Sequence, residues 1–394
     1  MTPELADESG WDIYEIARSD DPHAHWAALR EVAPVFDAGD GVFPLTKWEQ
    51  VHQVLHDARF GAGQGVAASF GNGSGLVFDA MRAWLMSLDG PPHQRARGLV
   101  RRQFTPRQLG SLRPLITELC DTLVSAVEAG GESVDLMRAL AFPLPSQVIR
   151  SLFGFEADVW AREIEALFAP GAAGEADALA TLDSMAQFFQ RTLEGVVPEG
   201  LLAKLQVADE ELGALSELEV VANAVLLVSA AIDTTAGLIG SALQCLLERP
   251  ALLARVREDP QLIPAAVEET LRFEPPALSC SRTAHETFVL EGVEIPAGSQ
   301  LLLSLAAANR DPDRYADPDV FKLDRDHTGL LSFGGGRHFC LGAALARVEA
   351  VSALTRLFVQ SELELELLSP PTWDLRNPTV RALAHLPVRV SKRK

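Results

Sequence analysis

Apolar residues recur along most of this chain at the spacing of an α-helix. The strongest such pattern spans residues 217–247, more than twice the length of an average helix, and its first half is apolar on almost every side. A helix that is apolar all round belongs in the core of a protein, so we expect this one to be buried. Shorter helical patterns are found at residues 93–104, 109–129, 136–153, 158–168, 178–193, 201–208, 264–273 and 343–358.

Strand patterns are short and few. Residues 288–290 and 293–295 lie on either side of a Glu-Gly turn, and residues 301–303 are a third apolar run. Residues 34–36 are strand-like, and residues 362–367, which alternate strictly between charged and apolar, are expected to end the small sheet portion. Together these patterns predict a mainly α-helical fold with small β-sheets.

The chain shows no change of composition that would mark a domain boundary. With 394 residues it could form two or three domains of average size, but we find no linker or repeat and expect a single large domain over residues 1–394. The glycine-rich residues 61–75 lack periodicity and are predicted to be a loop. A loop of this length within a compact protein is usually functional or disordered.

Charge and composition exclude several classes of partner. The formal net charge is −20, from 34 basic and 54 acidic residues, which argues against nucleic acid and anionic membranes as general partners. The most apolar stretch, residues 220–232, contains Asn223 and is too short for a membrane span. Residues 1–8 do not resemble a secretory signal, and the four cysteines lack paired spacing. We therefore expect a cytoplasmic protein that does not bind membranes.

Residues 331–342, the cysteine loop, contain the strongest candidate for chemistry. Three glycines, Gly334 to Gly336, lead to Cys340, and a helical pattern begins after it. A thiolate at Cys340 would be favoured by freed backbone N–H groups, by the positive end of the following helix and by Arg337. The spacing fits neither a P-loop nor a dinucleotide fingerprint, whereas haem iron is a known partner of cysteine thiolate. The alternative is a buried cysteine after an ordinary glycine turn.

The cysteine loop resembles the haem-ligand loop of the cytochrome P450 superfamily. The F-x-x-G-x-x-x-C-x-G spacing of that family is met by Phe333, Gly336, Cys340 and Gly342, and the similarity extends over residues 22–390. The resemblance implies the cytochrome P450 fold, haem b (iron protoporphyrin IX) as the cofactor and Cys340 as the ligand of its iron.

The long helical pattern has polar residues in its middle that are unfavourable in a core. Asp233, Thr234 and Thr235 are poor choices there, on propensity and because of desolvation. One explanation is that the threonines bond back to carbonyl groups one turn earlier and that Asp233 has a polar partner. By resemblance, Asp233 and Thr234 are the acid–alcohol pair that delivers protons to dioxygen, although Ala231 stands where the family often has glycine.

Glu269 and Arg272 lie three residues apart on one face of a predicted helix. On a surface such a pair would contribute only about 0.2–0.5 kcal/mol. With two prolines following, they resemble the buried E-x-x-R pair of the family, and the resemblance implies Arg325 as the third partner. The role of the three would be to hold the scaffold of the cysteine loop rather than to touch substrate.

Haem also carries two carboxylates that need hydrogen-bond donors. His93 and Arg97 lie four residues apart on one predicted helix face, and Arg282 and His338 come from two other segments. Each of them could be an ordinary surface residue, but all four match positions of the family. The resemblance therefore implies that they bind the haem carboxylates.

A monooxygenase activity follows from the resemblance: one oxygen atom of O₂ enters an organic substrate, by hydroxylation or epoxidation, and the other leaves as water. The segments expected to line the substrate pocket are mostly apolar or small, namely residues 61–86, 166–189, 226–230, 277–281 and 377–380. They favour a hydrophobic small-molecule substrate such as a terpenoid, steroid, fatty acyl or polyketide-like compound. A peroxide-driven haem oxidase and a non-catalytic haem sensor are the alternatives; such oxidases tend to lose the Asp233–Thr234 pair, and a sensor does not need it.

Both electrons for this reaction must come from another protein, because the chain contains no flavin or iron–sulfur motif. We expect a small acidic ferredoxin with its ferredoxin reductase as the donor, and a monomeric enzyme. Arginines predicted on the cysteine side of haem would form a basic docking patch: Arg95, Arg101, Arg102, Arg107, Arg337 and Arg347. The alternative is that these are ordinary solvated arginines.

Overall fold

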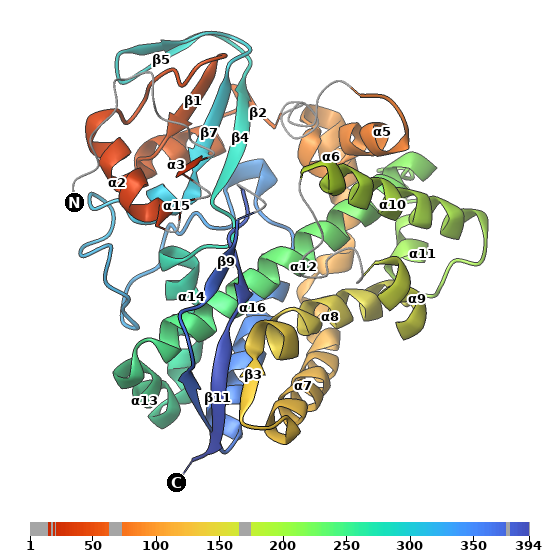
Figure 1. Ribbon diagram of the computed structural model, residues 1–394. Helices are drawn as coiled ribbons and strands as arrows, with labels where there is room; N and C mark the ends of the chain where they lie inside the picture. Colours follow the sequence, from red (N-terminus) through yellow and green to blue (C-terminus); the bar gives the residue numbers. More distant parts are fainter. Residues whose placement is uncertain are drawn as a thin grey trace.

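The computed structural model describes residues 15–16, 19, 21–62, 73–164, 175–375 and 379–393. Helix α12 (Glu217–Leu247) runs diagonally through the centre of the molecule, with a helical region on its right and a β-rich region at the upper left (Figure 1). The mainly α-helical fold with small β-sheets is confirmed. The bounds of α12 are those predicted from its apolar pattern.

The first turn of helix α12 is capped, and the turns that follow it are buried in the core. Ser216 and Glu219 form a capping box, in which Glu219 N donates to Ser216 Oγ (3.3 Å) and Ser216 N donates to Glu219 Oε2 (2.8 Å). Residues 220–225 are all buried, as expected for a helix that is apolar on every side. Among the described helices it alone is long and apolar enough to cross a membrane, but 61% of its apolar window is buried within the protein.

Two groups of helices pack against the two halves of α12. The N-terminal half shares an apolar cluster with α5 (Leu76–Ala83), α6 (Gly90–Arg101), α9 (Ala157–Glu163), α10 (Glu175–Glu194) and α11 (Leu201–Leu205). The C-terminal half shares another with α7 (Pro106–Ala129), α8 (Pro143–Phe153), α13 (Pro250–Glu258), α14 (Ile263–Phe273) and α16 (Ala343–Leu354). Helices α2 (Pro22–Val32), α3 (Trp48–His56) and α15 (Leu305–Ala308) accompany the β-rich region (Figure 1).

The strands form four small sheets. The largest has the order β1-β7-β4-β2, made of β1 (Val42–Leu45), β7 (Gln300–Ser304), β4 (Ser279–Ala284) and β2 (Phe60–Gly61); only the β1–β7 pair is parallel. A second contains β3 (Ser133–Asp135), β11 (Pro387–Lys392) and β8 (Leu363–Leu367). The two-stranded sheets pair β5 (Phe288–Leu290) with β6 (Val293–Ile295) and β9 (Thr372–Asp374) with β10 (Ala382–His385).

Several helices begin or end differently from the prediction, and prolines explain two of the differences. Residues 136–153 are a π-turn (Met137–Ala141) followed by α8, because Pro143 has no N–H to continue the first segment. Helix α6 begins at Gly90, because Pro91 and Pro92 fit a first turn, and its last predicted residues form a 3₁₀ turn (Arg102–Phe104). The segment predicted at 343–358 ends as α16 and a π-turn (Thr355–Gln360).

Other predicted elements are shorter, displaced or outside the described residues. The helix predicted at 158–168 is α9, which ends at Glu163, and residues 165–168 lie outside the described part of the chain; the helix predicted at 201–208 ends at Leu205. Residues 34–36 contribute only an isolated bridge between Val35 and Leu45. Of the loop predicted at 61–75, residues 63–72 lie outside the described part of the chain.

The expectation that residues 362–367 end the sheet portion is wrong. Strands β9, β10 and β11 follow β8, and β11 lies between β3 and β8 in its sheet. Strands β9 and β10 have three and four residues, too few for a period of two to be visible in the sequence. Strand β11 is longer, but its partners β3 and β8 are distant in the chain or precede it without a tight turn, so no hairpin signal marks it.

Helices α7 and α16 enclose a carboxyl group that has no ion pair among the described residues. Glu349 of α16 is 2% exposed, and its Oε2 has no hydrogen-bond partner there. Burial raises the pKa of Glu349 to about 8. The titratable groups around it include Cys120 of α7, whose thiol pKa is raised to about 12, first by burial and then by the charge of Glu349. The carboxyl is therefore protonated at neutral pH.

We expect Glu349→Gln to abolish a loss of stability that the parent protein undergoes as the pH rises from 4.5 to about 8. In the unfolded chain this carboxyl ionises near its ordinary pKa of 4.5, whereas in the folded protein it stays protonated up to about pH 8, so stability falls as the pH rises between these values. Urea unfolding should give similar midpoints for parent and variant near pH 4.5 and a higher midpoint for the variant at pH 8. The exposed Glu258→Gln should leave the pH dependence unchanged; a Glu349→Gln protein that follows the parent at every pH would contradict this interpretation.

Candidate functional site

The cysteine loop is shaped by its contact with helix α3. Cys340 N donates to Phe333 O (3.0 Å), which closes the loop. Gly334 and Gly336 have positive φ angles of 67° and 63°, and a Cβ on Gly336 would collide with the carbonyl oxygen of Leu55. The glycines are therefore needed for the backbone turn and for close packing on α3.

Cys340 is an exposed residue, but its thiol is partly desolvated by the protein around it. Burial raises the pKa of the thiol, while the N–H groups of Gly342 and Ala343 and the charges of Arg97 and Arg347 lower it. Nearby N–H dipoles and two guanidinium groups make this thiol a suitable donor to a metal cation.

Four predicted haem-carboxylate ligands meet beside the cysteine loop, and we call them the basic cluster: His93 and Arg97 from α6, Arg282 from β4 and His338 from the loop. The rings of His93 and His338 lie 4.2 Å apart, and Arg97 Nη2 donates to Phe339 O (2.5 Å). Burial, then the charges of His93 and Arg282, lowers the pKa of His338 to about 4.

The basic cluster is short of acceptors. Asp89 is the carboxylate that contacts it, at 3.3 Å from His338 Nε2. His93 is 2% exposed, and its Nε2 has no partner among the described residues. Buried nitrogen atoms without partners are rare in native proteins, so this one indicates a group that the fold is built to receive. Two guanidinium groups and two imidazoles around such a position fit the two carboxylates of haem.

The middle of α12 is accessible between two buried segments, residues 220–225 and 235–243. Ala230 is exposed, and Leu226, Leu227, Ala231 and Thr234 are partly exposed. Leu341 of the cysteine loop packs against the same apolar cluster as Leu226, Leu227 and Ala231. The accessible stretch and the loop are therefore linked through one apolar cluster.

Thr234 and Asp233 both lie on this stretch. Thr234 Oγ1 donates to Ala230 O at 2.5 Å. This is the hydrogen bond to a carbonyl group one turn earlier that the first explanation of the polar residues predicted. The bond fixes the hydroxyl group and leaves its oxygen lone pairs to accept a further hydrogen bond. Asp233 is partly exposed and has a polar interaction of its own.

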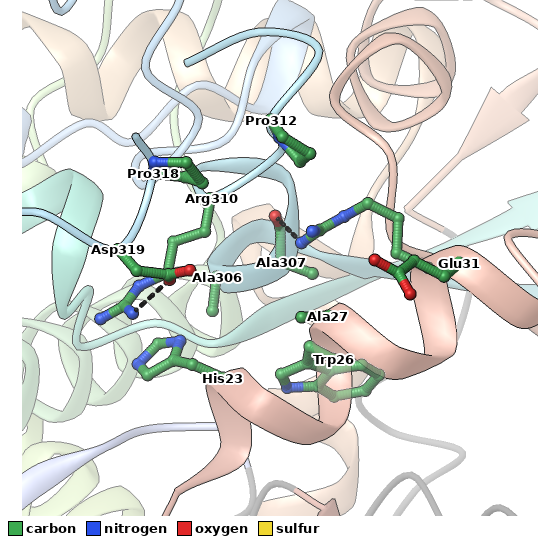
Figure 2. A pocket seen from close by; sticks show the side chains of 11 residues that line it. His23, Trp26, Ala27, Glu31, Ala306, Ala307, Arg310, Pro312, Pro318 and Asp319 are labelled. Carbon is green, nitrogen blue, oxygen red and sulfur yellow. Dashed lines mark hydrogen bonds and ion pairs between the residues drawn. The ribbon is translucent and has the colours of Figure 1, made fainter. Parts of the chain in front are cut away.

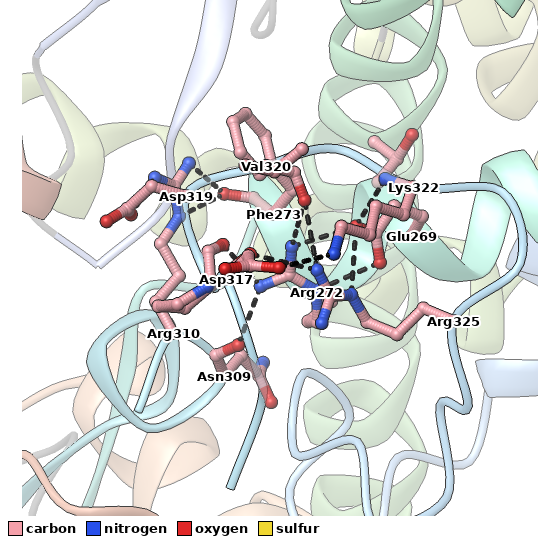
Figure 3. Close-up of polar contacts among 12 residues, drawn as sticks. Glu269, Arg272, Phe273, Asn309, Arg310, Asp317, Asp319, Val320, Lys322 and Arg325 are labelled. Carbon is pink, nitrogen blue, oxygen red and sulfur yellow. Dashed lines mark hydrogen bonds and ion pairs between the residues drawn. The ribbon is translucent and has the colours of Figure 1, made fainter. Parts of the chain in front are cut away.

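The structure brings Glu269, Arg272 and Arg325 together in one buried network (Figure 3). Arg272 donates to both Glu269 oxygens, at 2.8 and 2.9 Å, and Arg325 Nε donates to Oε1 at 3.2 Å. His327, which sequence reasoning missed, contacts Oε2 at 2.9 Å, and Lys322 N donates to Oε1 at 2.8 Å. Burial raises the pKa of Glu269, but the hydrogen bonds from Arg272 and His327 outweigh it and hold the pKa at about 2.

Asn309 links this network to the cysteine loop. The backbone carbonyl oxygen of Asn309 accepts a hydrogen bond from Arg272 Nη1 (3.1 Å). Its side-chain amide accepts from Leu331 N through Oδ1 (2.9 Å) and donates to Ser332 Oγ through Nδ2 (2.7 Å). Ser332 Oγ in turn donates to Leu271 O (2.5 Å). Sequence reasoning assigned no role to Asn309, because a lone asparagine carries no spacing signal.

A second buried network was also missed. Glu274 is contacted by His23 Nε2 at 3.2 Å and by Arg381 Nε at 2.8 Å, with Arg310 at 3.9 Å. Burial raises the pKa of Glu274, but these cations hold it at about 2. The partners come from residues 23, 274, 310 and 381, and a network so dispersed leaves no motif in the sequence.

The predicted docking patch is less basic than a count of arginines suggests. Arg95 pairs with Glu219, Arg102 with Asp209 and Arg347 with Glu268, so these three are neutralised by neighbouring carboxylates. Of these six, Arg101, Arg107 and Arg337 are exposed and have no side-chain hydrogen bond or ion pair among the described residues. The part of the prediction that treated all six as free is therefore corrected.

The segments expected to line the substrate pocket are partly described. Residues 277–281 and 379–380 lie next to each other, with a bridge between Ala277 and Val380 and a bond from Leu278 N to Thr379 O (3.0 Å). Residues 63–72, 166–174 and 377–378 of these segments lie outside the described part of the chain.

Comparison with known proteins agrees with this geometry. A family model described as Cytochrome P450 matches residues 176–385. The chain is 36% identical to Cytochrome P450 107B1 of Saccharopolyspora erythraea, over 95% of this chain and 96% of that protein, and 36% identical to the Vitamin D(3) 25-hydroxylase of Pseudonocardia autotrophica, over 97% of each. The chain belongs to the cytochrome P450 family.

Solved structures of cytochromes P450 have the same fold. A cytochrome P450 from Chondromyces apiculatus superimposes with a TM-score of 0.86 at 31% identity, over 98% of this chain and 99% of that one. P450BioI in complex with an acyl carrier protein ligated to hexadec-9Z-enoic acid gives a TM-score of 0.84 at 28% identity, over 96% and 100%. The cytochrome P450 fold, haem as the cofactor and the oxidoreductase class are thus confirmed at the family level.

We expect Glu269→Gln to destabilise the protein by about 3–5 kcal/mol, because two arginines would be left buried without their carboxylate. Urea unfolding followed by circular dichroism measures the change. The matched control is Glu366→Gln, which breaks the exposed pair between Glu366 and Arg389 (2.8 Å) and should alter stability little. Equal losses in the two variants would contradict the scaffold role of the Glu269 network.

Proposed function

We propose that this cytochrome P450 is a monooxygenase that inserts one oxygen atom of O₂ into a hydrophobic organic substrate with electrons from a separate ferredoxin and its reductase. The monooxygenase class follows from the family. When held by Cys340, haem supplies an iron at which O₂ is reduced, and thiolate ligation favours O–O cleavage. The geometry that supports the proposal best is the accessible stretch of α12, which carries Asp233 and Thr234 beside the cysteine loop.

The residues around the loop would hold the cofactor. Cys340 provides the thiolate, Phe333, Gly336 and Gly342 shape its loop, and the basic cluster binds the two carboxylates of haem. Glu269, Arg272 and Arg325 act at a distance, since they hold the segment from Asn309 to Ser332 that leads into the loop.

Asp233 and Thr234 would deliver protons. The Thr234 hydroxyl donates to Ala230 O, so its oxygen would accept a hydrogen bond and hold a proton donor such as water in place, and Asp233 would relay protons from water. A peroxide-driven oxidase or a haem sensor is the weaker proposal, because neither requires this pair. Oxygen consumption that depends on NADH and the redox partners distinguishes the monooxygenase from both.

The substrate would be a hydrophobic small molecule. Leu226, Leu227, Ala230 and Ala231 make the accessible stretch of α12 apolar and low in side-chain volume. Relatives are named for hydroxylation of vitamin D(3) and of 6-deoxyerythronolide B. These observations support a substrate of steroid, terpenoid, fatty acyl or polyketide type. We further propose that residues 1–394 form one domain and that the enzyme acts as a cytoplasmic monomer.

We expect Thr234→Ala to uncouple the reaction while the fold and the cofactor are kept. Loss of the fixed hydroxyl should leave NADH oxidation largely intact but divert electrons to hydrogen peroxide, so product formed per NADH should fall. The reduced carbon monoxide spectrum, whose strong red shift reports thiolate ligation, serves as the control and should match the parent. Unchanged coupling would show that Thr234 takes no part in proton delivery. If the parent protein consumes no oxygen in the presence of NADH and the redox partners, the proposed monooxygenase function is rejected.

The free arginines define a docking test for the ferredoxin. Charge reversal at Arg101, Arg107 and Arg337 together should slow reduction by ferredoxin about tenfold or more at low salt, because steering by opposite charges is lost. Dithionite, which needs no docking, should reduce parent and variant equally. The control reverses the exposed Lys204, Arg255 and Lys392, with the same change in net charge. A control variant that is slowed as much as the first would mean that net charge, and not this face, determines the rate.

A further inference from the structure

A second pocket lies apart from the cysteine loop. It has a volume of about 290 Å³ and lies between α2, α15 and the segment 310–319, and none of its lining residues belongs to the loop or to the basic cluster. Figure 2 shows Pro312 and Pro318 on the opposite side of this pocket from His23 and Trp26. The proposed oxidation assigns no role to this pocket.

Arg30 is a buried cation in the wall of the pocket. It is 8% exposed, and its hydrogen bonds go to neutral carbonyl groups, from Nη2 to Ala307 O (2.6 Å) and from Nε to Thr46 O (3.4 Å). No carboxylate forms an ion pair with it among the described residues. A guanidinium group desolvated in this way is unfavourable unless an anion joins it, and its Nη1 still has N–H groups to donate.

Other charged groups near Arg30 are already engaged or exposed. Arg310 pairs with Asp319 at 3.1 Å, and His23 pairs with Glu274. The remaining acids that raise the pKa of Arg30 do so from a distance, and they are Glu31 at the exposed edge, Asp311 and Asp313. Since burial is the larger effect, the pKa of Arg30 is lowered overall. None of these carboxylates forms an ion pair with Arg30 among the described residues.

The wall contains a further unpaired donor and an apolar surface. Trp26 is 2% exposed, and its indole N–H has no partner among the described residues. Buried donors of this kind normally bond to protein, water or ligand. Its ring lies on one side of the pocket and Pro312 and Pro318 lie on the other, as Figure 2 shows, and Ala27 adds a further apolar surface. The lining thus combines two donors, Arg30 and Trp26, with apolar surfaces, and its other charged residues are Glu31 at the exposed edge and His23, Arg310 and Asp319, which are paired.

We propose that this pocket is a binding site for a small organic carboxylate. The carboxylate accepts hydrogen bonds from Arg30, for which the planar guanidinium is well suited, and the apolar body lies between Trp26 and the two prolines. The site is independent of the proposed oxidation, because its residues contact neither the cysteine loop nor the accessible stretch of α12 in the observed network.

Titration of the haem-loaded protein with benzoate tests this site. We expect saturable binding by calorimetry, with no change in the Soret band, since the pocket is separate from the cofactor. The uncharged benzamide should bind about tenfold more weakly or not at all, because it lacks the charge that Arg30 requires. Absence of saturable benzoate binding, or equal binding of the two compounds, would overturn the proposal.

Variants locate the binding. Arg30→Gln should weaken benzoate binding by about tenfold or more, whereas Arg113→Gln, at an exposed position on α7, should leave it unchanged. Because Arg30→Gln removes a buried group and could impair folding, Ala27→Phe provides the second variant: it fills the pocket from a partly exposed position of α2 and should also weaken binding. Parent affinity in the folded Ala27→Phe protein would place benzoate elsewhere and reject this site.

Discussion

The carboxylate of Glu269 is the interaction on which the candidate site depends. It is 0% exposed and receives hydrogen bonds from Arg272, Arg325, His327 and the backbone of residue 322. Arg272 also donates hydrogen bonds to backbone carbonyl groups of the long segment between β7 and the cysteine loop. That segment has almost no regular secondary structure, so its backbone groups need these partners. Here a charge network supplies the hydrogen-bond partners that a sheet or a helix supplies elsewhere.

Helix α12 must satisfy two conflicting requirements. Residues 220–225 and 235–243 are buried, which stabilises the fold through apolar contact, but the stretch between them stays accessible. Small residues at Ala230 and Ala231 reconcile the two, because they leave space without a break in the helix. The same place tolerates Asp233 and Thr234, since a polar group beside an accessible space avoids much of the desolvation cost that it would have in a packed core.

Partners close in sequence were predictable from spacing, whereas distant partners were predictable only where the family resemblance supplied them, as for Arg325. The bounds of α12 follow from an uninterrupted apolar pattern, and the pairing of Glu269 with Arg272 follows from helical spacing. His327, Asn309 and the Glu274 network have no such spacing, because their partners lie dozens to hundreds of residues away. Strands β9 to β11 were not predicted for a related reason: β9 and β10 are short, and β11 pairs with β3, which is distant in the chain.

Charge shows most clearly why composition alone misleads. An arginine count predicted a broad basic patch, yet Arg95, Arg102 and Arg347 each meet a carboxylate from a distant segment, as a chain with 54 acidic residues allows. Arg97 and Arg282 differ, because they lie next to buried imidazoles and not next to acids. Burial lowers the pKa of His93, which favours its neutral form. In the proposed site, the two guanidinium groups would supply positive charge for the two carboxylates of haem, and the histidines would add hydrogen bonds.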